Sequence, residues 1–125
     1  MDVFVFGNPD LKEDSLPLKI LSDLKKQLPD FNFVVRDPNE EWDVSEELII
    51  IDTVLGIDKI TIFNDLKEFV SSPRVSLHDF DVFTNLLYLQ KLGKLKKIKI
   101  IGLPPMISEN NALESIKSML LSSQP

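Results

Sequence analysis

The amino-acid sequence predicts an α/β protein, a three-layer α/β/α sandwich around a mostly parallel five-stranded sheet. Short β-prone apolar runs alternate along the chain with helical patterns, which is typical of this class. Two runs, "VFVF" at 3–6 and "LIII" at 48–51, are apolar at every position. Such runs indicate strands that are buried on both faces, as in parallel sheets. The length of 125 residues and a hydrophobic content of 43% fit a single domain, 1–125.

The first half of the chain predicts two strands, a helix and a loop. The run at 3–6 is the first strand, and 31–35, "FNFVV", is the second. Between them, 16–28 predicts one amphipathic helix, with Pro17 in its first turn and Pro29 ending it. Its expected core positions are Leu18, Leu21, Leu24 and Leu28. The acidic segment 36–47 predicts a loop, in which Trp42 covers a small apolar patch.

The second half predicts three strands and two helices. After the strand at 48–51, the alternating segment 59–63 indicates an edge or antiparallel strand. A helix is predicted over 79–93, with Gly93 as its C-terminal cap, and a fifth strand over 98–102. The last helix is predicted over 108–121, with Ser108 as its N-cap.

Composition excludes several classes of function. A net charge of −6 argues against non-specific nucleic-acid binding, which needs a basic face. The chain contains no cysteine, so disulfides, thiol nucleophiles and thiolate metal sites are excluded. No apolar stretch approaches the roughly 20 residues that span a bilayer, and the N-terminus lacks the order of a signal peptide. We therefore expect a cytoplasmic protein that does not insert into membranes.

Polar side chains follow three of the predicted strands. Glu13 and Asp14 lie in the loop after the first strand, Asp52 follows "LIII", and His78, the single histidine, follows the fourth strand. In an open α/β sheet, ligands bind outside the carboxyl ends of the strands. Carboxylates and an imidazole are ligands that suit nickel, zinc or iron. The sequence therefore predicts a candidate metal site at this edge.

Each of these residues also has a purely structural interpretation. Glu13 and Asp14 could cap the following helix and interact with its positive end. An Asp after a buried strand commonly bonds to the backbone of the next turn. His78 could be a surface or capping residue. The two interpretations stay open at the level of single residues.

Four stretches of the sequence together resemble the hydrogenase maturation endopeptidases. These are "VFVFGNPDLKED", "LIIIDTVLG", "VSLHDFDVFTNLLYLQKLG" and "IKIIGLPP", which occur in the order of that family and span most of 3–105. The resemblance implies an endopeptidase that removes the C-terminal peptide of a [NiFe] hydrogenase large-subunit precursor.

The resemblance also implies the site residues. Asp14, Asp52 and His78 occupy the positions at which the family binds nickel, which the substrate precursor presents. Glu13 takes the first place of the family's acid pair and is a candidate catalytic base. We expect the protein to act as a monomer on a nickel-loaded precursor.

Two departures from the family pattern keep alternatives open. The segment "SLP" follows the acid pair where the family usually has a small residue and then Gly, and the region between "IDTVLG" and "RVSLH" is short. A non-catalytic metal- or precursor-binding protein of the same fold is therefore one alternative. A phosphoacceptor receiver domain is another, because receivers also place acids after the first and third strands.

Overall fold

A five-stranded sheet in the order β2-β1-β3-β5-β4 forms the centre of the molecule. The computed structural model describes residues 2–7, 15–36, 42, 44, 46–54, 56–67 and 77–122, with the backbone alone for 77–82. The strands are β1 (Asp2–Val5), β2 (Asn32–Val35), β3 (Glu47–Thr53), β4 (Thr61–Phe63) and β5 (Lys97–Leu103). All neighbours pair in parallel except β4, which is antiparallel to β5 at the sheet edge. The predicted mostly parallel sheet and its antiparallel edge strand are confirmed.

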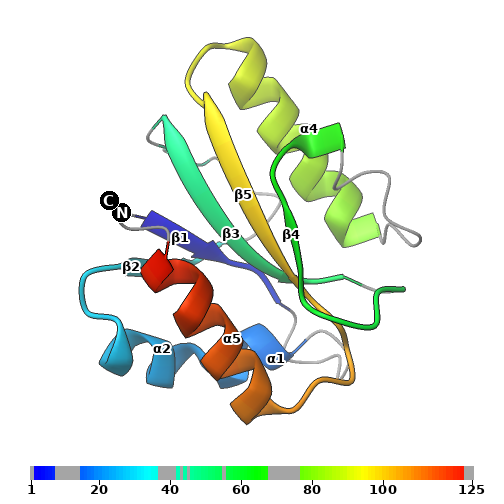
Figure 1. Ribbon diagram of the computed structural model, residues 1–125. Helices are drawn as coiled ribbons and strands as arrows, with labels where there is room; N and C mark the ends of the chain where they lie inside the picture. Colours follow the sequence, from blue (N-terminus) through cyan, green and yellow to red (C-terminus); the bar gives the residue numbers. More distant parts are fainter. Residues whose placement is uncertain are drawn as a thin grey trace.

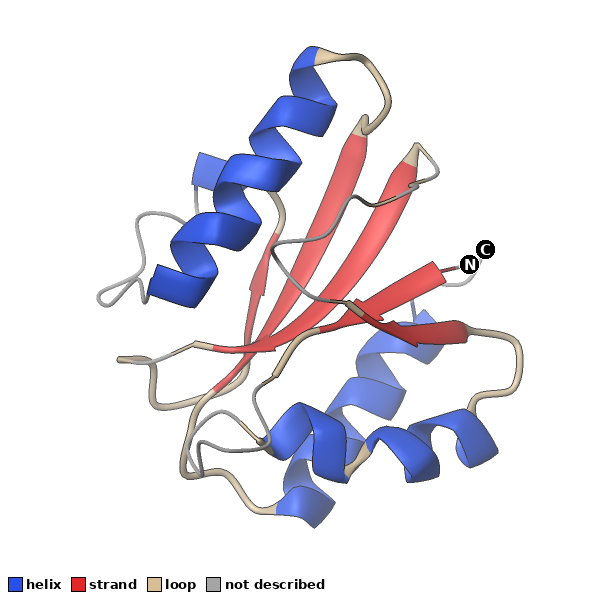
Figure 2. Ribbon diagram, turned by 180° about the vertical axis from the view of Figure 1, so that it is seen from behind, coloured by secondary structure: helices blue, strands red, loops and turns tan. Residues whose placement is uncertain are grey.

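Helices cover both faces of this sheet (Figure 1). On one face lie α1 (Leu16–Lys19), α2 (Leu21–Gln27) and α5 (Glu109–Ser122), and on the other lies α4 (Leu77–Lys91). Figure 2 shows the same layers from behind, with the sheet between the two groups of helices. The three-layer α/β/α architecture predicted from the sequence is therefore confirmed. No helix in the described part of the chain is both long and apolar enough to cross a membrane.

Strand alternation divides the apolar side chains into two cores. In β3, Ile49 and Ile51 pack with α1, α2 and α5, whereas Leu48 and Ile50 pack with Leu86 of α4. Both sides of β1 and β3 are buried, which explains why these strands read as unbroken apolar runs.

The predicted helix over 16–28 is wrong in one respect, because the structure has two short helices that meet at Ile20. Ile20 has φ −92° and ψ −3°, outside the range of a regular helix, and it ends α1 while capping α2. The break changes which side chains are buried. The buried leucines and isoleucine are Leu16, Ile20, Leu24 and Leu28, whereas Leu18 and Leu21 are only partly buried.

The predicted helix ends are largely confirmed. The backbone N–H of Asn111 donates to the Ser108 Oγ at 3.2 Å, so Ser108 caps α5. Gly93 follows α4 with φ +75°, a left-handed conformation that favours glycine. The start of α4 differs from the prediction, since the helix begins at Leu77 and includes residue 78 in its first turn.

Trp42 packs over the first strand on the α4 side of the sheet. Its ring lies 5.9 Å from that of Phe4 and 5.3 Å from that of Phe6, between ring centroids. The side chain is 7% exposed and belongs to the core on the α4 side. The prediction that Trp42 covers an apolar patch is confirmed.

Gly102 of β5 is required by close packing on the same side of the sheet. A Cβ atom at this position would lie 2.9 Å from Phe63 Cε2 and 2.9 Å from Val54 Cγ2. Both neighbours are buried and cannot move without disturbing the core. The absent side chain therefore lets β4 and the end of β3 close over β5.

Replacement of Gly102 by alanine is expected to lower the free energy of unfolding by about 1–3 kcal/mol, because an added methyl overpacks the core. Chemical denaturation measures the loss. Ser118→Ala, on an exposed position of α5, is the matched control and should change stability by less than about 0.5 kcal/mol. Equal stability of Gly102→Ala and wild-type protein would contradict the packing described here.

Candidate functional site

The direction of chain connections reverses between β1 and β3. From β1 the chain passes to β2 on one side, and from β3 it passes toward β5 and β4 on the other. Parallel pairing of Val3–Val5 with Ile49–Ile51 brings the carboxyl ends of both strands to one edge. A reversal of this kind leaves a crevice outside the carboxyl ends, where open α/β sheets bind ligands.

Asp52 lies at this reversal and is completely buried, with 0% of its surface exposed. The sequence predicts Asp52 directly after the strand, and the structure corrects this prediction. Asp52 is still part of β3 and pairs with Gly102 of β5. Because Leu48 and Ile50 face α4, alternation along β3 places Asp52 on the α4 side as well.

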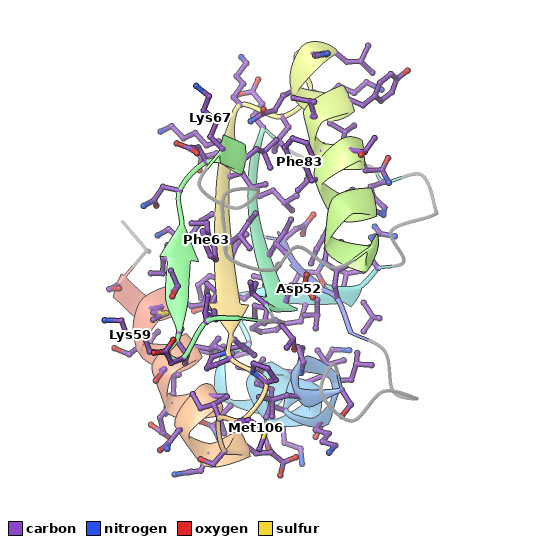
Figure 3. All side chains as sticks on the ribbon, turned by 90° about the vertical axis from the view of Figure 1, so that its right-hand side faces the viewer. Asp52, Lys59, Phe63, Lys67, Phe83 and Met106 are labelled. Carbon is purple, nitrogen blue, oxygen red and sulfur yellow. The ribbon has the colours of Figure 1, made fainter. Side chains whose placement is uncertain are left out.

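The surroundings of Asp52 on the β5 side are apolar. Gly102, its partner across the strands, contributes no side chain, and the space above it is filled by Val54, Ile57 and Phe63. In Figure 3, Asp52 lies near the N-terminal end of α4, at the carboxyl end of β3. An ionised carboxylate is costly in such surroundings unless a cation or hydrogen-bond donors compensate.

Two further polar residues are buried at the same edge. Ser15, 4% exposed, precedes α1 and follows the loop that leaves β1, and Thr53, 3% exposed, ends β3. With Asp52 they are the buried polar or charged residues of the described part of the chain. The sequence did not predict the burial of Ser15 and Thr53, because small hydroxyl residues are also usual in turns.

Asp52 and Thr53 are directed to opposite faces of the sheet. Asp52 faces α4, and Thr53, its neighbour, faces α1 and α5 by alternation. The Thr53 Oγ1 has no hydrogen-bond partner among the described residues. Thr53 is therefore buried beside the candidate site but points away from it.

The structure brings the first turn of α4 to the same face and the same end of the sheet as Asp52 (Figures 1 and 3). His78 belongs to this turn, because the helix begins at Leu77, two residues before its predicted start at 79. Its side chain lies outside the described part, as do Glu13 and Asp14 entirely. Of the predicted site residues, the structure thus places the side chain of Asp52 and the backbone of His78.

The described residues contain no group of three His, Asp or Glu side chains that could hold a metal ion. Asp52 is the predicted ligand whose side chain is described, and it supplies carboxylate oxygens. A buried carboxylate at a switch point, with a helix start that carries a histidine beside it, fits a divalent metal with mixed oxygen and nitrogen ligands. The ligand set of Asp14, Asp52 and His78 remains a prediction.

Two cavities lie at opposite ends of the sheet. One of about 620 Å³ is at the carboxyl end, between 56–60 and the turn at 104–107. Met106, on the rim of this cavity, is 92% exposed. The other, of about 430 Å³, lies at the amino ends of β3 and β5, beside Lys96, Lys97 and Lys99. The first cavity opens at the same end of the sheet as Asp52.

Comparison with known proteins identifies similar folds. The hydrogenase maturating endopeptidase HybD from E. coli superposes with a TM-score of 0.71 at 20% identity, covering 98% of this chain and 94% of the other. An endopeptidase from Escherichia coli, solved in solution, has a TM-score of 0.69 at 19% identity, with 98% and 91% covered.

A third similar structure is the hydrogenase 3 maturation protease, with a TM-score of 0.57 at 18% identity and coverage of 93% of this chain and 86% of the other. No protein-family model matches the sequence. No curated protein matches it either. The likeness is therefore one of structure over nearly the whole chain, and this protein has the fold of the hydrogenase maturation endopeptidases.

Proposed function

We propose that this protein is an endopeptidase that removes the C-terminal peptide of a nickel-loaded [NiFe] hydrogenase large-subunit precursor. The observation that carries the proposal is the complete burial of Asp52 at the strand-order reversal of this fold. Burial of an ionised carboxylate at that position opposes folding unless a cation or hydrogen-bond donors compensate, because desolvation disfavours the charged form. A cationic substrate group bound there gives the carboxylate its function.

In this proposal the nickel belongs to the substrate. Asp14, Asp52 and His78 bind the ion that the precursor carries, so that only a precursor with inserted nickel is held correctly. A bound nickel ion can orient the scissile segment, polarise its carbonyl group or activate water. Glu13, beside Asp14, is the candidate base for the attacking water.

The sheet topology argues against the receiver alternative. Receiver-type sheets have the order 2-1-3-4-5. Here β4 is the antiparallel edge strand and β5 lies between it and β3. Asp52 therefore neighbours β5 and not the fourth strand of a parallel series.

A non-catalytic precursor-binding protein remains the second candidate function. The feature that favours it is the short segment between "IDTVLG" and "RVSLH". In this case the same residues would bind the nickel of the precursor, and no peptide bond would be cleaved. The assay below distinguishes the two functions.

The protein is expected to cleave a nickel-loaded precursor and to leave the nickel-free precursor intact. Mass spectrometry of both precursors after incubation measures the loss of the C-terminal peptide. Asp52→Asn and His78→Ala should each abolish cleavage. Thr53→Val, next to Asp52 but on the opposite face, should retain it.

Three results would contradict parts of this account. Equal cleavage of both precursors would show that cleavage does not require nickel. Full activity of Asp52→Asn would show that Asp52 is not part of the site. Binding of the nickel-loaded precursor without cleavage would establish the non-catalytic function instead.

Asp52→Asn is further expected to leave the free energy of unfolding unchanged, or to raise it by up to about 1 kcal/mol. The substitution removes a buried charge at nearly constant volume. Thermal melts with and without nickel measure this effect beside the cleavage assay. A structural Asp that accepts backbone hydrogen bonds would instead lose roughly 1–2 kcal/mol on mutation. That loss, with cleavage retained by the folded variant, would identify Asp52 as a structural residue.

A further inference from the structure

Arg36 carries a positive charge at the same edge and on the same face of the sheet as Asp52. It directly follows β2, and its backbone N–H donates to the Val5 carbonyl oxygen at 3.1 Å, which continues the pairing of β2 with β1. Val34, two residues earlier, packs in the core on the α4 side, so alternation directs Arg36 to that side as well. The guanidinium has this direction, because its Cζ atom lies 4.9 Å from the centre of the Phe4 ring.

The strand register places Arg36 and Asp52 in one row across the sheet. Val5 of β1 is in register with the residue before Arg36 and with the residue before Asp52. Backbone hydrogen bonds continue both pairings by one residue, so Phe6 stands between Arg36 and Asp52. Because β1 separates their strands, the backbones of the two charged residues are two strand spacings, or about 10 Å, apart. The candidate site therefore carries charges of opposite sign on one face.

The Arg36 guanidinium has an aromatic support but no hydrogen-bonded anion among the described residues. The Phe4 ring stabilises its charge through a cation–π contact. This contact does not satisfy the N–H donors, which point outward in the plane of the group. The Nε atom is buried and has no hydrogen-bond partner in the described part of the chain. A buried donor without a partner costs free energy, which a ligand with acceptor oxygens would remove.

The shape of the guanidinium selects the kind of ligand. Its donors form a planar fork that binds a carboxylate through two parallel hydrogen bonds. Arg36 is partly exposed, so a ligand can reach the group. A polypeptide offers carboxylates on its acidic side chains and at its C-terminus. An acid of a bound polypeptide is thus the partner that fits Arg36.

A structural role for Arg36 would require an acid of the chain itself. Four acids lie between 37 and 45 in the sequence, outside the described residues. The next acids along the chain, Glu46 and Glu47, form ion pairs with two lysines instead. If an acid of 37–45 bound Arg36, replacement of Arg36 would destabilise the protein and would not change which substrate acid is recognised. The experiments below separate this case.

We propose that Arg36 binds a carboxylate of the precursor on the same face of the sheet on which Asp52 binds its metal. The inference rests on the proposed function, because it names a second group of the same substrate. Arg36 binds and orients the substrate and takes no part in the reaction. The site then selects a substrate that presents a metal ion and an acid together.

NMR titration with sodium acetate at constant ionic strength tests Arg36 without any precursor. The chain contains two arginines, Arg36 and Arg74, and Arg36→Lys identifies the Nε–Hε signal of Arg36 by its loss. Acetate is expected to shift this signal with a saturable response, whereas sodium chloride is not. An Arg36 signal that does not respond to acetate would overturn the proposal.

The nickel-loaded precursor provides the second test. Arg36→Met should raise the KM of cleavage at least about tenfold and leave kcat unchanged, because charge-assisted hydrogen bonds to the substrate are lost. Arg36→Lys keeps the charge but not the fork, so its KM should lie between. Lys26→Met, which removes an exposed positive charge from α2, is the matched control and should behave as the wild type does. If the precursor is bound without cleavage, its dissociation constant replaces KM.

A double-mutant cycle identifies the carboxylate. Each acid near the C-terminus of the precursor is replaced by its amide, and a further precursor carries an amidated C-terminus. One of these changes should weaken recognition by the wild type and have no further effect on Arg36→Met. Additive effects of every change, or a wild-type KM for folded Arg36→Met, would overturn the proposal. Additive effects together with a lower denaturation midpoint of Arg36→Met would show that Arg36 pairs within its own chain.

Failure of the proposed function gives a different result. A wild-type protein that neither binds nor cleaves the precursor would contradict the proposed function. In that case the acetate titration alone decides whether Arg36 forms a carboxylate site.

Discussion

Parallel pairing of β1 with β3 is the interaction on which the candidate site depends. It aligns Val5 with Ile51 and continues in the bond from the Phe6 N–H to the Ile51 carbonyl oxygen, 3.0 Å long. This register brings Phe6, directly after β1, to the end of β3. A slip of one residue would turn Asp52 from the α4 face to the opposite face. The position of the buried acid is therefore a consequence of backbone pairing within an apolar sheet.

The apolar residues around this pairing determine the chemistry of the acid. Gly102 lets Phe63 and Val54 pack closely over β5. Trp42 covers Phe4 of β1 and Phe6, which directly follows this strand. A carboxylate in such surroundings is poorly solvated, which strengthens its attraction to a cation. These surroundings are consistent with the metal-binding role that we propose for Asp52.

Much of the fold could be predicted because its strands are short and continuously apolar. The runs at 3–6 and 48–51 predicted buried parallel strands, and the alternation at 59–63 predicted the edge strand. The break at Ile20 could not be predicted, since helical spacing continues through it. The site was predicted less completely. The predicted strand 48–51 ended two residues before the observed end of β3 at Thr53, because a charged residue such as Asp52 normally marks the end of a buried strand.

Ser15 and Thr53 were missed for a related reason, since small hydroxyl residues are usual in turns and give no signal of burial. The positions of Glu13 and Asp14 lie outside the described residues, so their part in the site rests on resemblance. His78 was expected before a helix and belongs to its first turn. Sequence patterns predicted polar residues at the carboxyl ends of the strands. They did not predict that Asp52 and Thr53 are buried within the last part of β3.

The central claim is that Asp52 and His78 bind the same metal ion. His78 is the single histidine, so its imidazole nitrogens give one set of NMR signals that can be followed during titration with Zn²⁺, a diamagnetic substitute for nickel. The account predicts that Zn²⁺ shifts these signals in the wild-type protein and that Asp52→Asn, folded and stable, requires far more Zn²⁺ for the same shift. Identical titration curves for the two proteins would contradict a site shared by Asp52 and His78.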